Sequence, residues 1–298
     1  MNWLGWLSTA VVLTSIEQVL NRMLLSRNAG SSTSADNSTG TSSNNYLIGY
    51  NLGALATTLL LFHPSFERLS QLSLALLVIS GVLWFLAAYF SFKADSQVEA
   101  STTVLIGQTQ LVLLFIGGLL IFSESVTLLK TGGATLILGG LTFGLLKRSA
   151  TTSQAQSTRA HRLGVMSKFA AVIASSAALL IDKSLTGAVD VAIIPVFGYL
   201  VPSFLTVALR PTRMIEDLNY SKSIRFSNCF MGAIGAISYF SLIKSFSSGE
   251  ISAVYPLFQL HILLTLFLAN VFLKEKGEFR TRWLTATSII LGAICLSV

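Results

Sequence analysis

Long apolar runs recur along the whole chain and are separated by short polar segments. An apolar helix of about 20 residues crosses the roughly 30 Å hydrocarbon core of a bilayer. The runs reach that length, so we predict an all-α, polytopic membrane protein with ten transmembrane helices. The predicted spans are roughly 3–23, 46–62, 72–92, 98–121, 127–146, 164–186, 190–209, 227–246, 250–272 and 281–297.

Rare polar residues repeat at a nearly constant spacing in the two halves of the chain. Tyr89-Phe90-Ser91 recurs as Tyr239-Phe240-Ser241, and after a slip of one residue the later matches share one offset. Polar matches of this kind indicate an internal duplication, because chance matches in so hydrophobic a sequence would be apolar. The later pairs are Lys93/Lys244, Glu99/Glu250, Ser101/Ser252, Gln108/Gln259 and Glu124/Glu275.

The duplication divides the ten spans into two units of five. We place the first unit at 1–147, a polar linker at 148–162 and the second unit at 163–298. A unit with an odd number of spans begins and ends on opposite sides of the membrane, so its second copy inserts upside down. The sequence therefore predicts two inverted five-helix repeats, related by a pseudo-two-fold axis in the membrane plane.

The composition fits a membrane protein. Hydrophobic residues make up 52% of the chain and charged residues 11%, whereas a soluble domain has about 25% charged residues. Cys229 and Cys295 both fall inside predicted spans, which argues against a disulfide framework. The sequence has no metal-ligand spacing, no nucleotide-binding loop and no nucleophile–base pair. We therefore expect no cofactor, no bound metal and no enzymatic activity.

The net charge of +7 comes from loop residues, so it indicates orientation in the membrane rather than a nucleic-acid partner. The basic residues gather in the loops after the odd-numbered spans, apart from Arg68, Lys130, Lys183 and Lys244. The positive-inside rule then places those loops in the cytoplasm and both termini outside. We expect a multi-pass protein of the plasma or inner membrane, as a monomer or a homodimer.

The two stretches 89–146 and 239–291 resemble the drug/metabolite transporter superfamily, in its ten-helix form with two EamA-like repeats. In each, a helix ends in a Lys-containing turn, a Ser-rich helix follows, and Glu124 or Glu275 precedes a Gly-rich last helix. The resemblance covers nearly the whole chain and implies a transporter whose third and eighth spans line a central cavity. Two features depart from the family pattern. The second span lacks the usual Arg, and family members keep both termini in the cytoplasm.

Glu17 is the leading candidate for a functional residue. An acid inside a span is costly unless it faces a cavity or a partner. Small multidrug transporters of the same superfamily are similar here, because a first-helix Glu exchanges protons for a cationic substrate. We predict that Glu17 couples protonation to substrate binding. The alternative is a structural ion pair with Arg22 or Lys183.

A polar stripe marks the ninth span and its counterpart. Ser252, Tyr255 and Gln259 share one face of the predicted helix, and Gln108 matches Gln259 in the fourth span. Such a stripe either lines a cavity or holds helices together, and Tyr255, which is not duplicated, favours ligand contact. His261 is either a proton carrier or a neutral hydrogen-bonding residue. We predict that Gln108, Tyr255, Gln259 and His261 orient the solute.

Three aromatic residues of the third and eighth spans, Trp84, Tyr89 and Tyr239, complete the predicted substrate site. Aromatic belts explain rings at span ends without any ligand. If the two spans line the cavity, as the resemblance implies, these rings contact the substrate. With Glu17 they would suit a quaternary amine through cation–π contacts.

The remaining acids are predicted to be structural. Glu99 and Glu250 begin the fourth and ninth spans, where negative charge complements the helix dipole. Glu124 and Glu275 lie in the turns before the next helices and are expected to cap helices or to stabilise turns. Asp182, which is followed by a lysine, is expected to form an interfacial pair.

Together these features predict a secondary active transporter that works by alternating access with proton or exchange coupling. Its substrate would be a small polar or amphipathic metabolite or a drug-like amine. The expected partners are this small molecule and the lipid bilayer, with no nucleic acid. Two alternatives stay open: a flippase for lipid headgroups or lipid-linked sugars on the same fold, and a membrane scaffold that transports nothing.

Overall fold

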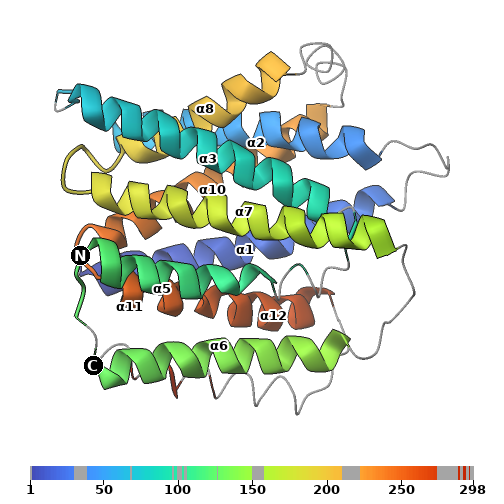
Figure 1. Cartoon of the computed structure of the whole chain (residues 1–298). Helices are drawn as coiled ribbons and strands as arrows, with labels where there is room; N and C mark the ends of the chain where they lie inside the picture. Colours follow the sequence, from blue (N-terminus) through green and yellow to red (C-terminus); the bar gives the residue numbers. More distant parts are fainter. Residues whose placement is uncertain are drawn as a thin grey trace.

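A computed structural model shows the chain as a bundle of helices lying side by side (Figure 1). It describes residues 2–29, 39–67, 69–95, 97–98, 103, 106–125, 127–149, 158–209 and 222–273, together with 288, 291–292 and 295. Within these residues the regular elements are all helical, as the all-α prediction requires.

The helices follow the predicted spans closely. They are α1 (Trp3–Ala29), α2 (Thr39–Phe62), α3 (Gln71–Asp95), α5 (Thr109–Ile121), α6 (Leu128–Ser149), α7 (Thr158–Leu185), α8 (Ile193–Leu209), α10 (Lys222–Phe246), α11 (Ile251–Phe258) and α12 (Leu260–Leu273). Helices lie in each predicted range from 3–23 to 250–272, although α5 covers only the second half of 98–121 and residues 99–102 and 104–105 lie outside the described part of the chain. The last range, 281–297, lies largely outside the described residues, as do 150–157 of the predicted linker.

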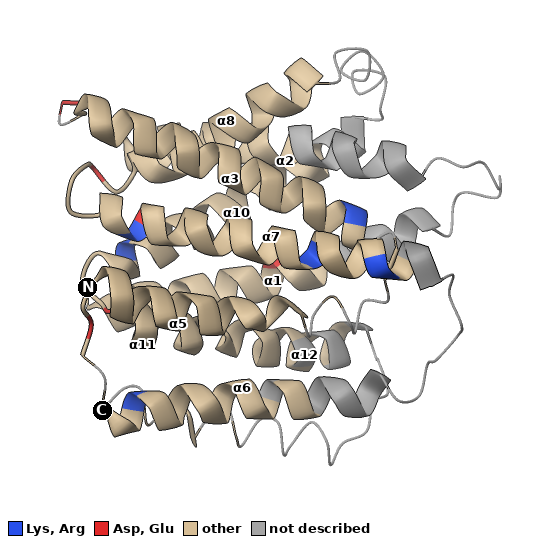
Figure 2. Cartoon of the chain, viewed as in Figure 1, with Lys and Arg blue, Asp and Glu red and all other residues tan. Residues whose placement is uncertain are grey.

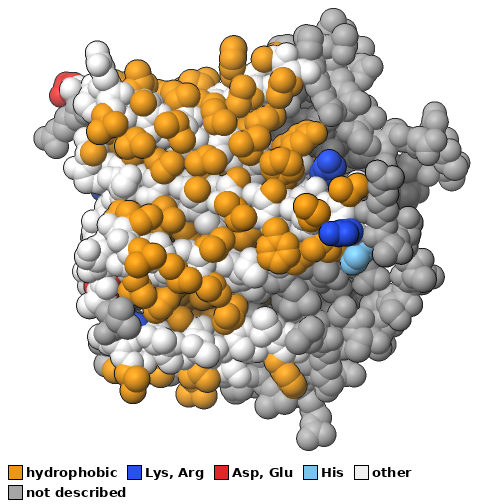
Figure 3. Space-filling model, in the orientation of Figure 1, with side chains coloured by type: hydrophobic (Ala, Val, Ile, Leu, Met, Phe, Trp, Pro, Cys, Tyr) orange, Lys and Arg blue, Asp and Glu red, His pale blue; other side chains and the backbone are white. Residues whose placement is uncertain are grey.

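The surface of the bundle suits a lipid environment. Leu60, Leu120 and Phe204 are each at least 70% exposed, and hydrophobic side chains cover much of the face in Figure 3. Charged residues gather mainly at the two ends of the bundle (Figure 2). An apolar belt between charged ends is the surface that a hydrocarbon layer requires. Among the described residues, four segments are long and apolar enough to cross a membrane: Trp3–Leu20, Gln71–Asp95, His161–Leu185 and Phe226–Phe246.

The fourth and ninth spans are both interrupted at the duplicated glutamines. Gln108 is the residue before α5, and Gln259 separates α11 from α12. Leu111 N–H donates to the Gln108 carbonyl at 3.1 Å, and Ile262 N–H donates to the Gln259 carbonyl at 3.0 Å. The two halves therefore contain the same local turn. In the ninth span Pro256 contributes to the interruption, because proline has no N–H for the helical hydrogen-bond ladder.

Two glycines let helices from different halves of the chain approach closely. A Cβ on Gly81 of α3 would meet Val201 and the Phe197 carbonyl of α8. A Cβ on Gly232 of α10 would meet the backbone of Tyr50 in α2. At each crossing the absent side chain allows backbone-to-backbone packing, which is how small residues work at interfaces between membrane helices.

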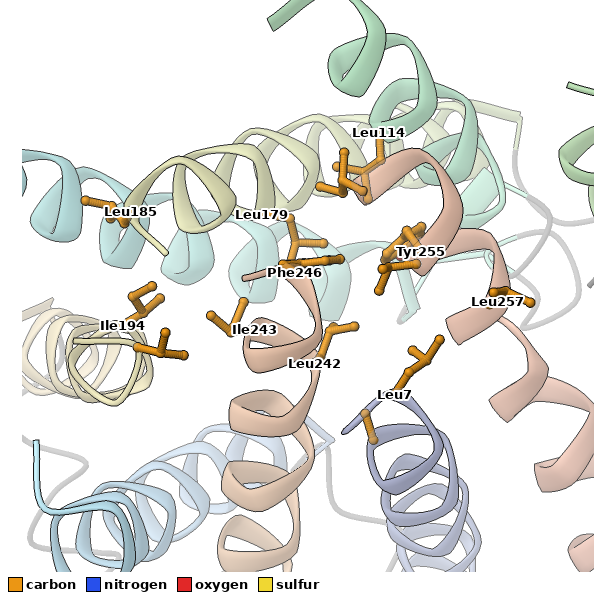
Figure 4. Close-up of a cluster of buried hydrophobic side chains, with 14 of the residues drawn as sticks. Leu7, Leu114, Leu179, Leu185, Ile194, Leu242, Ile243, Phe246, Tyr255 and Leu257 are labelled. Carbon is orange, nitrogen blue, oxygen red and sulfur yellow. The ribbon is translucent and has the colours of Figure 1, made fainter. Parts of the chain in front are cut away.

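Buried aliphatic and aromatic side chains seal one end of the bundle. Leu185, Ile194, Ile243 and Phe246 pack together where α7 and α10 end and α8 begins (Figure 4). All four are at most 1% exposed. This group, which we call the apolar plug, fills the space where α7, α8 and α10 of the second half meet.

Polar contacts reinforce the same end. The Glu124 carboxylate accepts hydrogen bonds from the backbone N–H groups of Ile251 at 2.7 Å and Ser252 at 2.9 Å. The capping role predicted for Glu124 is confirmed, although it caps α11 of the other half. Glu250 makes no side-chain cap of α11 and instead forms an ion pair with Lys130. Glu250 nevertheless is the N-cap residue of α11, so its negative charge lies where it complements the helix dipole, as expected.

Candidate substrate cavity

A cavity of about 1070 Å³ lies between the helices beside the apolar plug. Its wall on α3 extends from Trp84 to Asp95 and on α8 from Gly198 to Leu209. Asp95 and Leu209 are exposed residues at the ends of their helices, so the cavity opens at that end of the bundle. Leu242 belongs to both the cavity wall and the hydrophobic core around the plug, which closes the other end.

Glu17 projects from α1 into this cavity. The hydroxyl of Tyr50, on α2, donates a 2.9 Å hydrogen bond to Glu17 Oε1. Gly235, on α10, makes room for the pair, because a Cβ there would overlap the Tyr50 hydroxyl and lie 3.3 Å from Glu17 Oε2. A glycine on a third helix thus allows an acid and a tyrosine to meet within the bundle.

Lys183 does not pair with Glu17. Its ammonium group donates to the backbone carbonyls of Phe246 and Gly249 at the closed end. The described ion pairs, Lys130–Glu250 and Lys168–Asp95, likewise do not include Glu17. The alternative of a Glu17–Lys183 ion pair is therefore wrong. The other suggested partner, the side chain of Arg22, lies outside the described part of the chain.

A row of aromatic rings crosses the cavity wall. Tyr50 contacts Tyr199 with ring centroids 6.3 Å apart, and the two side chains are hydrogen-bonded. Tyr199 contacts Tyr239 at 5.9 Å, and Tyr239 contacts Trp84 at 5.6 Å. All three contacts are edge-to-face, which is a favourable arrangement for aromatic quadrupoles. The row provides ring faces and edges beside the Glu17 carboxylate.

Asp182 lies behind this row and is fully buried. It accepts hydrogen bonds from Ser80 Oγ at 2.5 Å, Trp84 Nε1 at 3.1 Å and the Tyr239 hydroxyl. The expectation of an interfacial pair is wrong, because α3 and α10 pack over this part of α7 and exclude solvent. A buried acid thus fixes two rings of the cavity wall.

Hydroxyl and amide groups line the rest of the wall. Gln110 Nε2 donates to Ser175 Oγ at 3.0 Å, which joins α5 to α7. Thr14 and Ser238 share a 2.5 Å hydrogen bond between α1 and α10. Asn51, from α2, adds a second amide. The wall therefore offers both donors and acceptors of hydrogen bonds.

Five of the residues that we predict to form the substrate site line the cavity: Glu17, Trp84, Tyr89, Tyr239 and Tyr255. The structure places the other three outside the cavity wall. Gln108 and Gln259 are each 4% exposed, and the Gln259 side chain is hydrogen-bonded to Tyr255. His261 Nδ1 lies 2.8 Å from the Phe258 carbonyl. Because the ninth span is interrupted at Gln259, the residues on either side of it face different neighbours.

Several lining residues were not predicted from the sequence. Among them, Tyr50, Gln110, Ser175 and Tyr199 make the polar and aromatic contacts described above, and Asn51 lines the wall. Gln110 had a usable signal, since it lies opposite His261 in the repeat. Tyr50 and Tyr199 each follow a glycine in one of two shorter apolar helices, Gly49–Phe62 and Ile193–Leu209, and a comparison of the second and seventh spans would have found them. Within the described residues, no group of His, Cys, Asp and Glu could hold a metal ion.

A family model described as "Sugar transport protein" matches residues 29–298. The chain belongs to the sugar transport protein family. Membership identifies a membrane transporter, and with the four long apolar helices it identifies an integral membrane protein. It also favours transport over catalysis.

Comparison with solved structures supports the fold alone. A structure described only as "Crystal structure of protein" is similar with a TM-score of 0.71 at 14% identity. The match covers 99% of this chain and 96% of that chain, so the whole helical arrangement is shared. No curated protein matches the sequence significantly.

Proposed function

We propose that the protein is a secondary transporter for a sugar or a similar polyhydroxylated solute, which binds in the cavity beside Glu17. The observation that supports this most strongly is the pairing of a carboxylate with a row of aromatic rings in one cavity. The family description points to the same class of solute. The cavity is large for a ligand site, so a sugar could enter it with part of its water.

The side chains suit the two faces of a sugar. Its hydroxyl groups both donate and accept hydrogen bonds, and a carboxylate can accept from two neighbouring hydroxyls. Glu17 supplies that acceptor, and the amides of Asn51 and Gln110 supply donors as well as acceptors. The C–H face of a sugar ring is apolar and packs on aromatic rings, here Trp84 and Tyr239.

The packing of the helices supports two inverted repeats. If α1, α2 and α3 correspond to α7, α8 and α10, exchanging the halves converts the α3–α7 contact into the α10–α1 contact. It also converts the α3–α8 contact into the α10–α2 contact. The close approaches at Gly81 and Gly232 lie in these two corresponding helix pairs, α3–α8 and α10–α2.

Both halves contribute equally to the proposed site. Glu17 and Ser175 come from the first helix of each half, and Tyr50 and Tyr199 come from the second. A site between two inverted units becomes accessible from the other side when one unit rocks against the other. The present arrangement, open at the Asp95 end and sealed by the apolar plug, would be one of the two states.

In this mechanism Glu17 remains our proposed coupling residue. Its contact with Tyr50 links α1 to α2, and its second oxygen faces the space beside Gly235. A proton bound to Glu17 would change it from an acceptor of sugar hydroxyls into a donor. Solute affinity would then depend on protonation, which is the requirement for proton coupling.

An organic amine is the second candidate substrate. Glu17 has no basic partner among the described ion pairs, and rings lie close to it. An acid with aromatic neighbours attracts cations through charge and through the ring faces. This candidate makes the opposite prediction for neutral solutes, which would not bind.

Thermal-shift measurements on the purified full chain would separate the candidates. A ligand that binds only the folded state raises its stability by about 2.7 kcal/mol at one hundred times its Kd. We expect neutral sugars to raise the melting temperature of the wild type and not that of Glu17→Gln. Glu67→Gln removes an equivalent charge from an exposed residue outside the cavity wall and should keep the response. Stabilisation by quaternary amines alone would contradict the sugar proposal.

A further inference from the structure

The cavity wall is connected to a second acid that does not itself line it. Asp182 is buried on α7, and two of its three hydrogen-bond donors, Trp84 and Tyr239, line the cavity. Tyr239 also accepts a hydrogen bond from Trp84 Nε1 at 2.9 Å. These two side chains therefore connect the acid to the contents of the cavity.

We propose that Asp182 is a proton-binding site, and that its protonation turns the Tyr239 hydroxyl from the acid toward the cavity. The consequence of this protonation for transport rests on the proposed function. The proton site itself rests on the contacts of Asp182 alone. Glu17 is then one of two acids that respond to pH, one in each half of the chain.

The surroundings of Asp182 provide hydrogen-bond donors without a countercharge among the described residues. α3 contributes Ser80 and Trp84, α10 contributes Tyr239, and α5 contains no titratable residue. Lys183 follows Asp182 in the sequence, but its ammonium group donates to backbone carbonyls of residues that follow α10 or end it. A buried carboxylate without a cation is costly, and a bound proton removes that cost.

The other charged or titratable residues of the packed helices lie more than one turn from these contacts. Among the residues whose side chains are described, they are Tyr89, Lys93 and Asp95 on α3, Cys229 and Lys244 on α10, and His161, Arg162 and Lys168 on α7. Tyr199 of α8 contacts the ring of Tyr239. Through Tyr50 it extends the aromatic row to Glu17, so the two acids share one set of side chains.

Tyr239 provides a route for the proton. When a hydronium ion in the cavity gives a proton to the Tyr239 oxygen, the original hydroxyl hydrogen can pass to Asp182, and a neutral water molecule remains. One proton moves from the hydronium ion to the carboxylate, and no electron is transferred. Protonated Asp182 then donates to the Tyr239 oxygen, and the Tyr239 hydrogen is free to donate to a solute hydroxyl. Solute binding and protonation at Asp182 would therefore reinforce one another.

Infrared difference spectroscopy between acidic and alkaline pH tests the proposal on the full chain labelled with ¹³C-aspartate. We expect an isotope-sensitive band from a buried carboxylic acid that is lost in Asp182→Asn. Asp190→Asn is the matched control, because Asp190 accepts hydrogen bonds from the N–H groups of Ser65 and Ala192 away from the cavity wall. The band should persist in this control. Absence of the band from the wild type, or its persistence in Asp182→Asn, would overturn the proposal.

A second variant keeps the test decisive if Asp182→Asn does not fold. Tyr239→Phe removes one hydrogen bond from Asp182, so the band should shift in frequency, whereas Tyr89→Phe changes a cavity tyrosine remote from the acid and should leave it in place. An unchanged band in Tyr239→Phe would contradict the assignment. Loss of sugar binding with the band intact would refute the proposed function and leave the proton site standing. Sugar binding by a protein that lacks the band would refute the proton site and leave the proposed function standing.

Discussion

The hydroxyl of Tyr50 donates a 2.9 Å hydrogen bond to the carboxylate of Glu17, and this contact joins α2 to α1 at the wall of the cavity. The bond orients an acid that would otherwise move freely in a wide space. It also connects the acid to Tyr199 and the rest of the aromatic row. The geometry of the proposed sugar site therefore depends on this pair.

Tyr50→Phe should weaken sugar binding without unfolding the protein. A hydrogen bond to a charged group contributes about 1.5–3 kcal/mol, and affinity falls about tenfold for each 1.4 kcal/mol. We expect a loss of roughly tenfold or more in affinity, measured by equilibrium binding of labelled sugar. Glu67→Gln, at an exposed acid outside the cavity wall, is the control and should have little effect. Equal losses in the two variants would mean that Tyr50 does not orient Glu17.

Gly235→Ala, a change on α10, should block the proposed sugar site. The added Cβ would overlap the Tyr50 hydroxyl and crowd Glu17 Oε2, so the pair must separate. We expect sugar binding to be lost while the protein still folds, because the crowded atoms are the ends of side chains. Gly132→Ala on α6 has open space around its Cβ and should bind as the wild type does. Normal binding by Gly235→Ala would contradict the placement of the site beside Glu17.

Gly232→Ala should act on stability instead. Its Cβ would meet the backbone of Tyr50 and Ala54, and backbone cannot move aside as a side chain can. Overpacking costs typically about 1–3 kcal/mol, so the melting temperature should fall clearly. Gly139→Ala, which has open space, should match or exceed the wild type, because alanine favours a helix by about 0.5–1 kcal/mol. A drop of the same size in both variants would show that helix contact is not the cause.

Glu124→Ala should loosen the closed end of the cavity. It removes the acceptor of two backbone N–H groups at the start of α11, and loss of a helix cap costs typically about 1 kcal/mol. The apolar plug should then open more often. In a background without Cys229 and Cys295, a cysteine at position 246 should react several-fold faster with a membrane-impermeant maleimide.

Glu67→Ala serves as the control for this measurement, because Glu67 is an exposed acid in the segment between α2 and α3. Its labelling rate should equal that of the unchanged background. If Glu124→Ala also left the rate unchanged, the cap would be a purely local feature of α11.

The sequence predicted the helices well because hydropathy determines which segments enter a membrane. Glu17 was identified for the same reason, since an acid in an apolar run stands out. Asp182 was misjudged because its environment depends on α3 and α10 packing over it, which its own segment does not reveal.

Tertiary packing also limited what the sequence could predict about the ninth span. The prediction treated 250–272 as one helix, so it placed Ser252, Tyr255 and Gln259 on one face. Ser252 and Tyr255 both lie in α11 before the interruption at Gln259, yet only Tyr255 of the three reaches the cavity wall. A single proline signalled the interruption, but the direction of each side chain after it depends on tertiary contacts.

The most direct test of the account is sugar counterflow in proteoliposomes containing the purified protein. Vesicles loaded with an unlabelled sugar that stabilises the protein are diluted into the same labelled sugar, and uptake is followed over time. We predict a transient accumulation of label with the wild type and with Glu67→Gln, and none with Glu17→Gln. Undiminished accumulation with Glu17→Gln, or none for any sugar with folded wild type, would contradict a sugar transporter organised around this acid.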